Sequence, residues 1–202
     1  MTALLAVGGL YLALPRSLAV GPGWLLLAIV TVLIIPAMIA HHRGHTAINV
    51  ALGHLLAGII TLFMLWSLAL LVMALPTHKE PPVALLHSAA ALWLTNVLVF
   101  ASWYWRLDAG GPHQRAKRLG HTAGAFLFPQ MVAGEPHARE KNGTPWSPKF
   151  VDYLFIAFNT STALSPTDAP VLSRWAKTLM MIQSLISLTV IAILLGRAIN
   201  TL

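Results

Sequence analysis

Residues 47–75, AINVALGHLLAGIITLFMLWSLALLVMAL, decide the fold class of this chain. Apart from His54, the stretch carries no acidic or basic side chain. About 20 apolar residues in a helix cross the hydrocarbon core of a bilayer, so this stretch is long enough to span a membrane with a tilt. Three further apolar segments lie at 23–40, 83–105 and 177–200, and a shorter one at 2–14 is expected to continue through 17–20.

The composition of the whole chain supports the same class. Its residues are 57% hydrophobic and only 9% charged, whereas soluble domains carry about 25% charged residues. We therefore predict an all-α, polytopic helical membrane protein with about five transmembrane helices and one short helix, re-entrant or sixth spanning. It forms one membrane domain in three parts: the N-terminal transmembrane helices at 1–105, a polar loop at 106–148 without a core of its own, and a helix-loop-helix at 149–202.

Residues 150–164 are the ambiguous element of this layout. As a helix they would extend about 22 Å, which is less than the ~30 Å of hydrocarbon. Asp152 near their start and the polar run 159–162 near their end make the segment less lipid-like. A re-entrant helix buried against protein suits these features, and a short sixth crossing is the alternative.

The order of elements in 149–202 resembles the pore module of potassium channels, in which a pore helix runs into T-x-T-T-V-G-Y-G-D and a lining helix follows. Thr160, Thr162 and Asp168 match that motif, whereas Ser165 and Thr167 replace both filter glycines and Pro166 stands between them. The glycine angles that let successive carbonyls face an ion are strained for other residues, so the resemblance implies a degenerate pore loop without potassium selectivity. The alternative is an ordinary turn at 165–168. The pore-lining candidates are Thr160, Thr162, Ser165 and Asp168, with Gln183 and Ser187 on the last helix. In a pore, Gln183 and Ser187 would face water; in a bundle, they would bond a neighbouring helix.

A second resemblance covers roughly residues 93–202. The order Trp103-Tyr104-Trp105, the loop 108–112 with Asp108 and two glycines, the run 126–129 ending in Phe-Pro, and the aromatic segment 150–155 is similar to an uncharacterised bacterial family of small polytopic integral membrane proteins. Asp168 matches the aspartate of that family's last loop. This resemblance implies an all-helical membrane fold and supplies no activity.

Basic residues predict which face of the membrane each loop occupies. If 150–164 spans, nine lysines and arginines lie on one face and four on the other; if it is re-entrant, the division is ten against three. Either division makes the 106–149 loop cytoplasmic, whereas potassium channels present the loop before the pore helix to the outside. The sequence leaves this conflict open.

Four residues inside the long helices are interpreted as packing positions. Gly53 and Ala57 have the small-x-x-x-small spacing of close helix contacts, His54 between them is expected to be buried and hydrogen-bonded, and Asn96 is expected to bond a neighbouring helix. His41 and His45 share a helix face, but no third ligand is fixed by spacing. We therefore predict no metal and no cofactor. The chain also lacks paired carboxylates, a nucleophile elbow and a phosphate loop, so it is expected not to be an enzyme.

Two functions follow as expectations. The first is a bacterial inner-membrane protein whose pore-loop-like module forms an oligomeric ion or small-solute channel, a tetramer if the design is pore-like. The second is a non-conducting accessory or structural subunit that binds other membrane subunits. The net charge of +7 lies in loops beside apolar helices, so the lipid bilayer, and not nucleic acid, is the expected partner.

Overall fold

The computed structural model describes residues 2–75, 81–118, 120–121, 123–133, 139–140, 143–162 and 169–199. Apart from two isolated bridges, the regular structure of these residues is helical, which confirms the all-α class. Four helices are long and apolar enough to cross a membrane: Trp24–His42, Thr46–Ala74, Val83–Gly110 and Arg174–Gly196. They coincide with the four long apolar segments of the sequence and are compatible with a multi-pass membrane protein.

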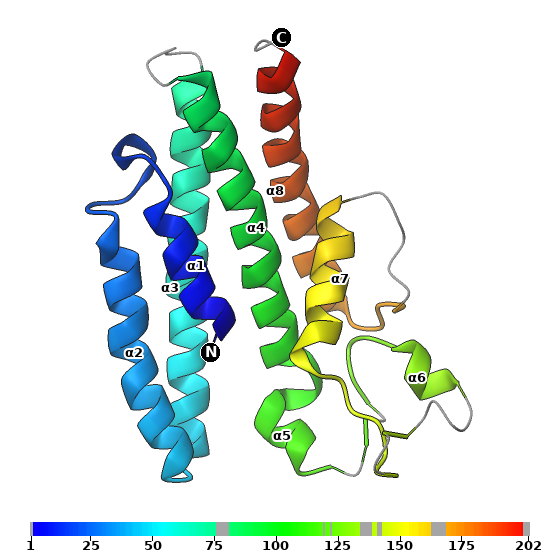
Figure 1. The fold of residues 1–202 in the computed structure, drawn as a ribbon. Coiled ribbons are helices and arrows are strands. Elements are labelled where there is room, and N and C mark those ends of the chain that lie inside the picture. Colours follow the sequence, from blue (N-terminus) through cyan, green and yellow to red (C-terminus); the bar gives the residue numbers. More distant parts are fainter. Residues whose placement is uncertain are drawn as a thin grey trace. The chain divides into compact units, whose positions relative to one another are not determined.

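The helices follow one another along the chain as drawn in Figure 1. They are α1 (Thr2–Leu12), η1 (Arg16–Leu18), α2 (Trp24–His42), α3 (Thr46–Ala74), α4 (Pro82–Leu107), η3 (Asp108–Gly110), α5 (Pro112–Ala116), α6 (Pro129–Val132), α7 (Phe150–Thr162) and α8 (Arg174–Ile199).

The chain forms two compact units, Met1–Val99 with Ile186–Leu202, and Phe100–Leu185. Their limits fall inside α4 and α8, so each of these helices contributes to both units. In the first unit α2 packs against α1 and α3. The Asn49 side chain of α3 donates a 2.7 Å hydrogen bond to the Ala37 carbonyl of α2, which ties the two helices together.

The first apolar segment differs from its prediction. The helix α1 ends at Leu12, and residues 16–18 form a separate 3-10 turn instead of continuing it. Pro15 explains the break, because a proline cannot donate the helical hydrogen bond and disfavours helical angles at the residue before it. The Val20 amide then donates to the Tyr11 hydroxyl, so the chain after α1 is fastened beside the helix.

The second unit has an aromatic core. The rings of Tyr104 and Phe126 lie 5.3 Å apart, and those of Phe128 and Tyr153 lie 5.5 Å apart. Tyr104 comes from α4 and Tyr153 from α7, whereas the two phenylalanines come from the polar loop and are themselves buried. The loop therefore shares its core with the two helices.

The helix α7 is short and is buried along one side. Asp152 accepts a 2.6 Å hydrogen bond from the Lys149 amide, which satisfies one of the free donors at the start of a helix. Tyr153, Ile156, Ala157 and Thr160 are buried along one side at helical spacing. At 13 residues α7 is about 20 Å long, so it falls outside the four helices long enough to span.

The chain segments before and after α7 pair with each other. The Leu127 amide donates to the Pro170 carbonyl at 2.9 Å, and the Leu172 amide donates to the Ala125 carbonyl at 2.7 Å. A bridge joins Phe126 and Val171 between these two bonds. The chain therefore returns, after α7 and the residues that follow it, to the place that it left before α7.

Candidate functional site

The end of α7 is fastened to α8 by Gln183. Its amide nitrogen donates to the Ala157 carbonyl and to the Ser161 hydroxyl, both at 2.7 Å. Its amide oxygen accepts a 2.5 Å hydrogen bond from the Tyr104 hydroxyl of α4. Gln183 is fully buried, so this one side chain connects three helices where an unbonded amide would be costly.

Ser187, one helical turn further along α8, also bonds within the chain. Its hydroxyl accepts a 2.7 Å hydrogen bond from the Asn96 amide of α4, and both residues are buried. Gln183 and Ser187 thus share a face, as their spacing indicates, and that face bonds neighbouring helices.

The threonines of the channel-like run lie at the end of α7. Thr160 is buried, its hydroxyl bonds the Ile156 carbonyl, and its own carbonyl accepts a 3.4 Å bond from the Ser184 hydroxyl. Thr162 is partly buried, and its hydroxyl bonds the Asn159 carbonyl at 3.1 Å. Ser165 and Asp168, and with them the turn considered at 165–168, lie outside the described residues.

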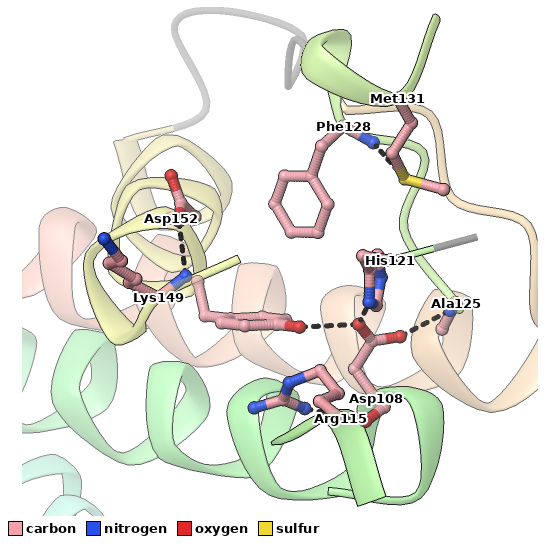
Figure 2. Close-up of polar contacts among 9 residues, drawn as sticks. Asp108, Arg115, His121, Ala125, Phe128, Met131, Lys149 and Asp152 are labelled. Carbon is pink, nitrogen blue, oxygen red and sulfur yellow. Dashed lines mark hydrogen bonds and ion pairs between the residues drawn. The ribbon is translucent and has the colours of Figure 1, made fainter. Parts of the chain in front are cut away.

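A second polar group, which the sequence did not predict as a site, surrounds the carboxylate of Asp108, as Figure 2 shows. The Ala125 amide donates to Oδ1 at 2.5 Å, the Tyr153 hydroxyl donates to Oδ2 at 2.6 Å, and His121 Nε2 lies 3.2 Å from Oδ2. The Arg115 guanidinium donates to the Asp108 carbonyl at 2.7 Å. We call these five residues the Asp108 cluster. Asp108 and Tyr153 are fully enclosed, and Arg115 and His121 are buried.

Two glycines allow the Asp108 cluster to close. Gly111 has a φ of +88°, and a Cβ there would lie 2.7 Å from the Arg106 carbonyl oxygen. This tight turn leads into α5, which carries Arg115. A Cβ on Gly124 would lie 2.5 Å from His121 Nε2 and 2.8 Å from Asp108 Oδ1, so the loop approaches the carboxylate this closely only because residue 124 has no side chain.

Electrostatic and ring contacts add to the hydrogen bonds of the Asp108 cluster. Burial lowers the pKa of the Arg115 guanidinium, while Tyr153 and Asp108 act in the opposite direction. Burial, followed by the Asp108 carboxylate, raises the pKa of Tyr153, so its hydroxyl stays protonated and donates. The Arg115 guanidinium also lies 5.1 Å from the centre of the Tyr153 ring, a cation–π distance that ties α5 to α7.

The Asp108 cluster is suited to hold the polar loop in place. Its carboxylate has contacts from two residues of the loop and from Tyr153 of α7, and it is closed to solvent. Among the described residues, no three histidine, cysteine, aspartate or glutamate side chains are grouped so that they could hold a metal ion. The arrangement therefore joins the end of α4, the loop and the start of α7 into one piece.

Asp152, at the start of α7, lines two cavities. The larger, of about 570 Å³, is lined by charged and aromatic side chains; the smaller, of about 160 Å³, is mostly apolar. The larger is lined by Arg139, Glu140, Trp146, Ser147, Lys149, Val151 and Asp152. These openings, unlike the Asp108 cluster, can admit a ligand.

The packing candidates of the long helices lie in the first unit. Gly53 and Ala57 are buried on α3, and Asn96 is buried on α4. His54 is less buried than predicted, whereas the predicted hydrogen bond is present: its Nδ1 lies 2.8 Å from the Val50 carbonyl of its own helix. The neighbouring positions 53, 56 and 57 form the buried side of α3 here, and residue 54 stands about 100° around the helix from residue 53.

Comparison with protein-family models, with curated proteins and with solved structures finds no match to this chain. Its function is therefore inferred from the geometry described above.

Proposed function

We propose that this chain is a multi-pass membrane protein in which α7 is a re-entrant helix. The pairing of residues 125–127 with residues 170–172 carries the proposal, because it brings the two flanks of α7 together. A segment that leaves and returns at one place enters the membrane without crossing it. The length of α7, about 20 Å against a hydrocarbon core of ~30 Å, agrees with this.

The hydrogen bonds between α7 and α8 indicate how deep in the membrane the C-terminal end of α7 would lie. Gln183 lies nine residues after Arg174, which corresponds to about 14 Å along α8. The end of α7, bonded to Gln183, would then lie near the middle of the membrane. The helix dipole gives the C-terminal end of α7 a partial negative charge, which favours a cation.

On this arrangement we propose a path for a cation or small solute at the end of α7. Thr162, at the end of α7, lines this path, and Ser165 and Asp168 remain candidates from the sequence alone. Gln183 and Ser187 are left out of the lining, because their polar atoms bond other helices of the same chain. One module encloses no channel, so the path requires a homo-oligomer, and a tetramer is the expected form.

The charges of the loops set the proposed orientation. A re-entrant α7 gives ten basic residues on the face of the 106–149 loop and three on the other. The positive-inside rule then makes this loop cytoplasmic in a bacterial inner membrane. The re-entrant helix would enter from the cytoplasm, opposite to a potassium channel.

A non-conducting subunit is the second candidate, and the surface of α8 favours it. Met181, Leu185 and Leu188 are all more than half exposed. Gln183, Ser184 and Ser187 of the same helix, in contrast, bond neighbouring helices of the chain. An apolar outer face fits lipid or a neighbouring membrane subunit as well as another copy of the chain.

Single-cysteine labelling tests the re-entrant arrangement, because the natural chain has no cysteine. Leu172→Cys and Ala123→Cys, both at exposed positions, should react with an impermeant maleimide from the same side of the membrane, and Ser17→Cys from the other. If Leu172→Cys and Ala123→Cys react from opposite sides, α7 spans and the proposal is wrong.

Flux into proteoliposomes separates the two functions. Thr162→Phe should reduce the ion flux of the wild-type protein, and Thr31→Phe is the matched control, because Thr31 is exposed on α2 and also bonds a carbonyl of its own helix. Equal flux in both variants contradicts a path along Thr162. Wild-type protein without flux supports the accessory function.

A further inference from the structure

The larger cavity beside Asp152 has features that neither proposed function uses. Its wall carries two cations, Arg139 and Lys149, and two carboxylates, Glu140 and Asp152. Lys149 Nζ lies 3.1 Å from Glu140 Oε2, and the side chain of Lys149 is 69% exposed. The cavity therefore presents both signs of charge within one opening.

The cavity is built on fixed elements of the second unit. Arg139 donates a 3.2 Å hydrogen bond to the Gly143 carbonyl, and the Glu140 amide donates to the Thr144 carbonyl at 2.8 Å. The Trp146 ring packs against Phe128 at 5.4 Å and against His121 of the Asp108 cluster at 6.5 Å. The aromatic wall is thus held by the same contacts that hold the polar loop.

An apolar strip leads away from the cavity along α7. Val151 lines the cavity and is 63% exposed, and Phe155 and Phe158 follow at helical spacing with exposures of 52% and 46%. The spacing of four and three residues puts all three on one side of the helix. Because α7 starts at the cavity and would run into the membrane, the strip extends from the headgroup level into the acyl chains.

We propose that this cavity binds the headgroup of a phospholipid that carries both a phosphate and a primary ammonium group. Arg139 and Lys149 bind the phosphate, Glu140 and Asp152 accept hydrogen bonds from the ammonium, and one acyl chain lies along Val151, Phe155 and Phe158. Trp146 stands at the level where tryptophan is favoured at a membrane surface. The inference rests on the proposed re-entrant arrangement of α7, because that arrangement puts the cavity at the membrane surface.

The balance of charges selects this lipid over others. A purely anionic headgroup would meet the two carboxylates as well as the two cations, and like charges disfavour it. A trimethylated ammonium has no N–H group and cannot donate to Glu140 or Asp152. The site should therefore prefer phosphatidylethanolamine to phosphatidylglycerol and to phosphatidylcholine.

Native mass spectrometry of the full-length protein, with the three lipids supplied at equal acyl composition, tests the site. The wild-type protein should retain phosphatidylethanolamine most strongly. Arg139→Gln should weaken retention of phosphatidylethanolamine and phosphatidylglycerol by about tenfold, the change that accompanies loss of one charged contact. Glu140→Gln should remove the preference for phosphatidylethanolamine. Lys177→Gln, an exposed basic position on α8 outside the cavity, is the control and should change nothing.

Three results would overturn the proposal: equal retention of the three lipids, equal loss in Lys177→Gln, or displacement of the lipid by glycerophosphoethanolamine at equal concentration. The last would show that the ligand is a soluble headgroup compound. The measurement of lipid retention is independent of the flux assay and of the cysteine labelling that test the proposed function. If labelling shows that α7 spans while retention still depends on Arg139 and Glu140, the re-entrant proposal fails and the lipid site stands.

Discussion

Replacing Tyr153 by phenylalanine tests whether the Asp108 carboxylate holds the second unit together. The hydroxyl of Tyr153 donates its bond at 2.6 Å to a fully buried carboxylate. A hydrogen bond to a charged group contributes about 1.5–3 kcal/mol to stability. The ring remains, so its packing against Phe126, Phe128 and the Arg115 guanidinium should persist, and the loss should come from the hydrogen bond alone.

Tyr104→Phe is the matched control. Tyr104 is equally buried and packs against the same Phe126 ring, but its hydroxyl donates to the neutral amide oxygen of Gln183. A bond between neutral groups contributes about 0.5–1.5 kcal/mol. The two variants therefore differ mainly in the charge of the acceptor that they leave behind.

Thermal unfolding in detergent, followed by tryptophan fluorescence, measures both variants. For a chain of this length about 1 kcal/mol shifts Tm by about 2–4 °C. Tyr153→Phe should then lower Tm by about 3–12 °C and Tyr104→Phe by about 1–6 °C. If Tyr153→Phe costs no more than Tyr104→Phe, the carboxylate is not the charged centre of the cluster and the reasoning is refuted.

Two further predictions concern close packing and the junction of three helices. Gly124→Ala should lower Tm, because its Cβ would lie within 3 Å of the His121 ring and the Asp108 carboxylate. Gly58→Ala is the control: a Cβ there meets nothing within 4 Å, so Tm should stay equal or rise. Equal Tm changes in the two variants would contradict the close approach at Gly124. Gln183→Met should cost about 2–4 kcal/mol, since it leaves the Ala157 carbonyl and the Tyr104 and Ser161 hydroxyls without this partner. A denaturant titration in detergent that detects less than about 1 kcal/mol would show that these groups find other partners.

The long helices could be predicted because an apolar run of 18 or more residues is typical of a membrane helix and of few other structures. The predicted segment 47–75 and the observed Thr46–Ala74 differ by one residue at each end. The first segment was predicted less well. Its apolar residues suggested a helix that continues past Pro15, whereas that proline ends the helix. Apolar character thus indicates where a helix can lie, whereas its ends depend on single residues.

The polar contacts of the second unit could not be predicted in the same way. Asp108 and Tyr153 are 45 residues apart, and Tyr104 and Gln183 are 79 residues apart. No periodic pattern in the sequence links such partners, because their contact depends on the tertiary packing. A signal was nevertheless present: Asp108 stands directly after an apolar helix, where an unpaired carboxylate would be costly, and two glycines follow it.

The pairing of residues 125–127 with residues 170–172 and the contacts of α7 with α8 form a frame around α7. Thr162 is held on α8 through its neighbours in α7, and Ala169 adjoins the paired residues 170–172, so the contacts of the frame come from residues on either side of positions 163–168. Because these contacts are made by residues on either side of positions 163–168, the frame should keep its geometry when the side chains at those positions are exchanged.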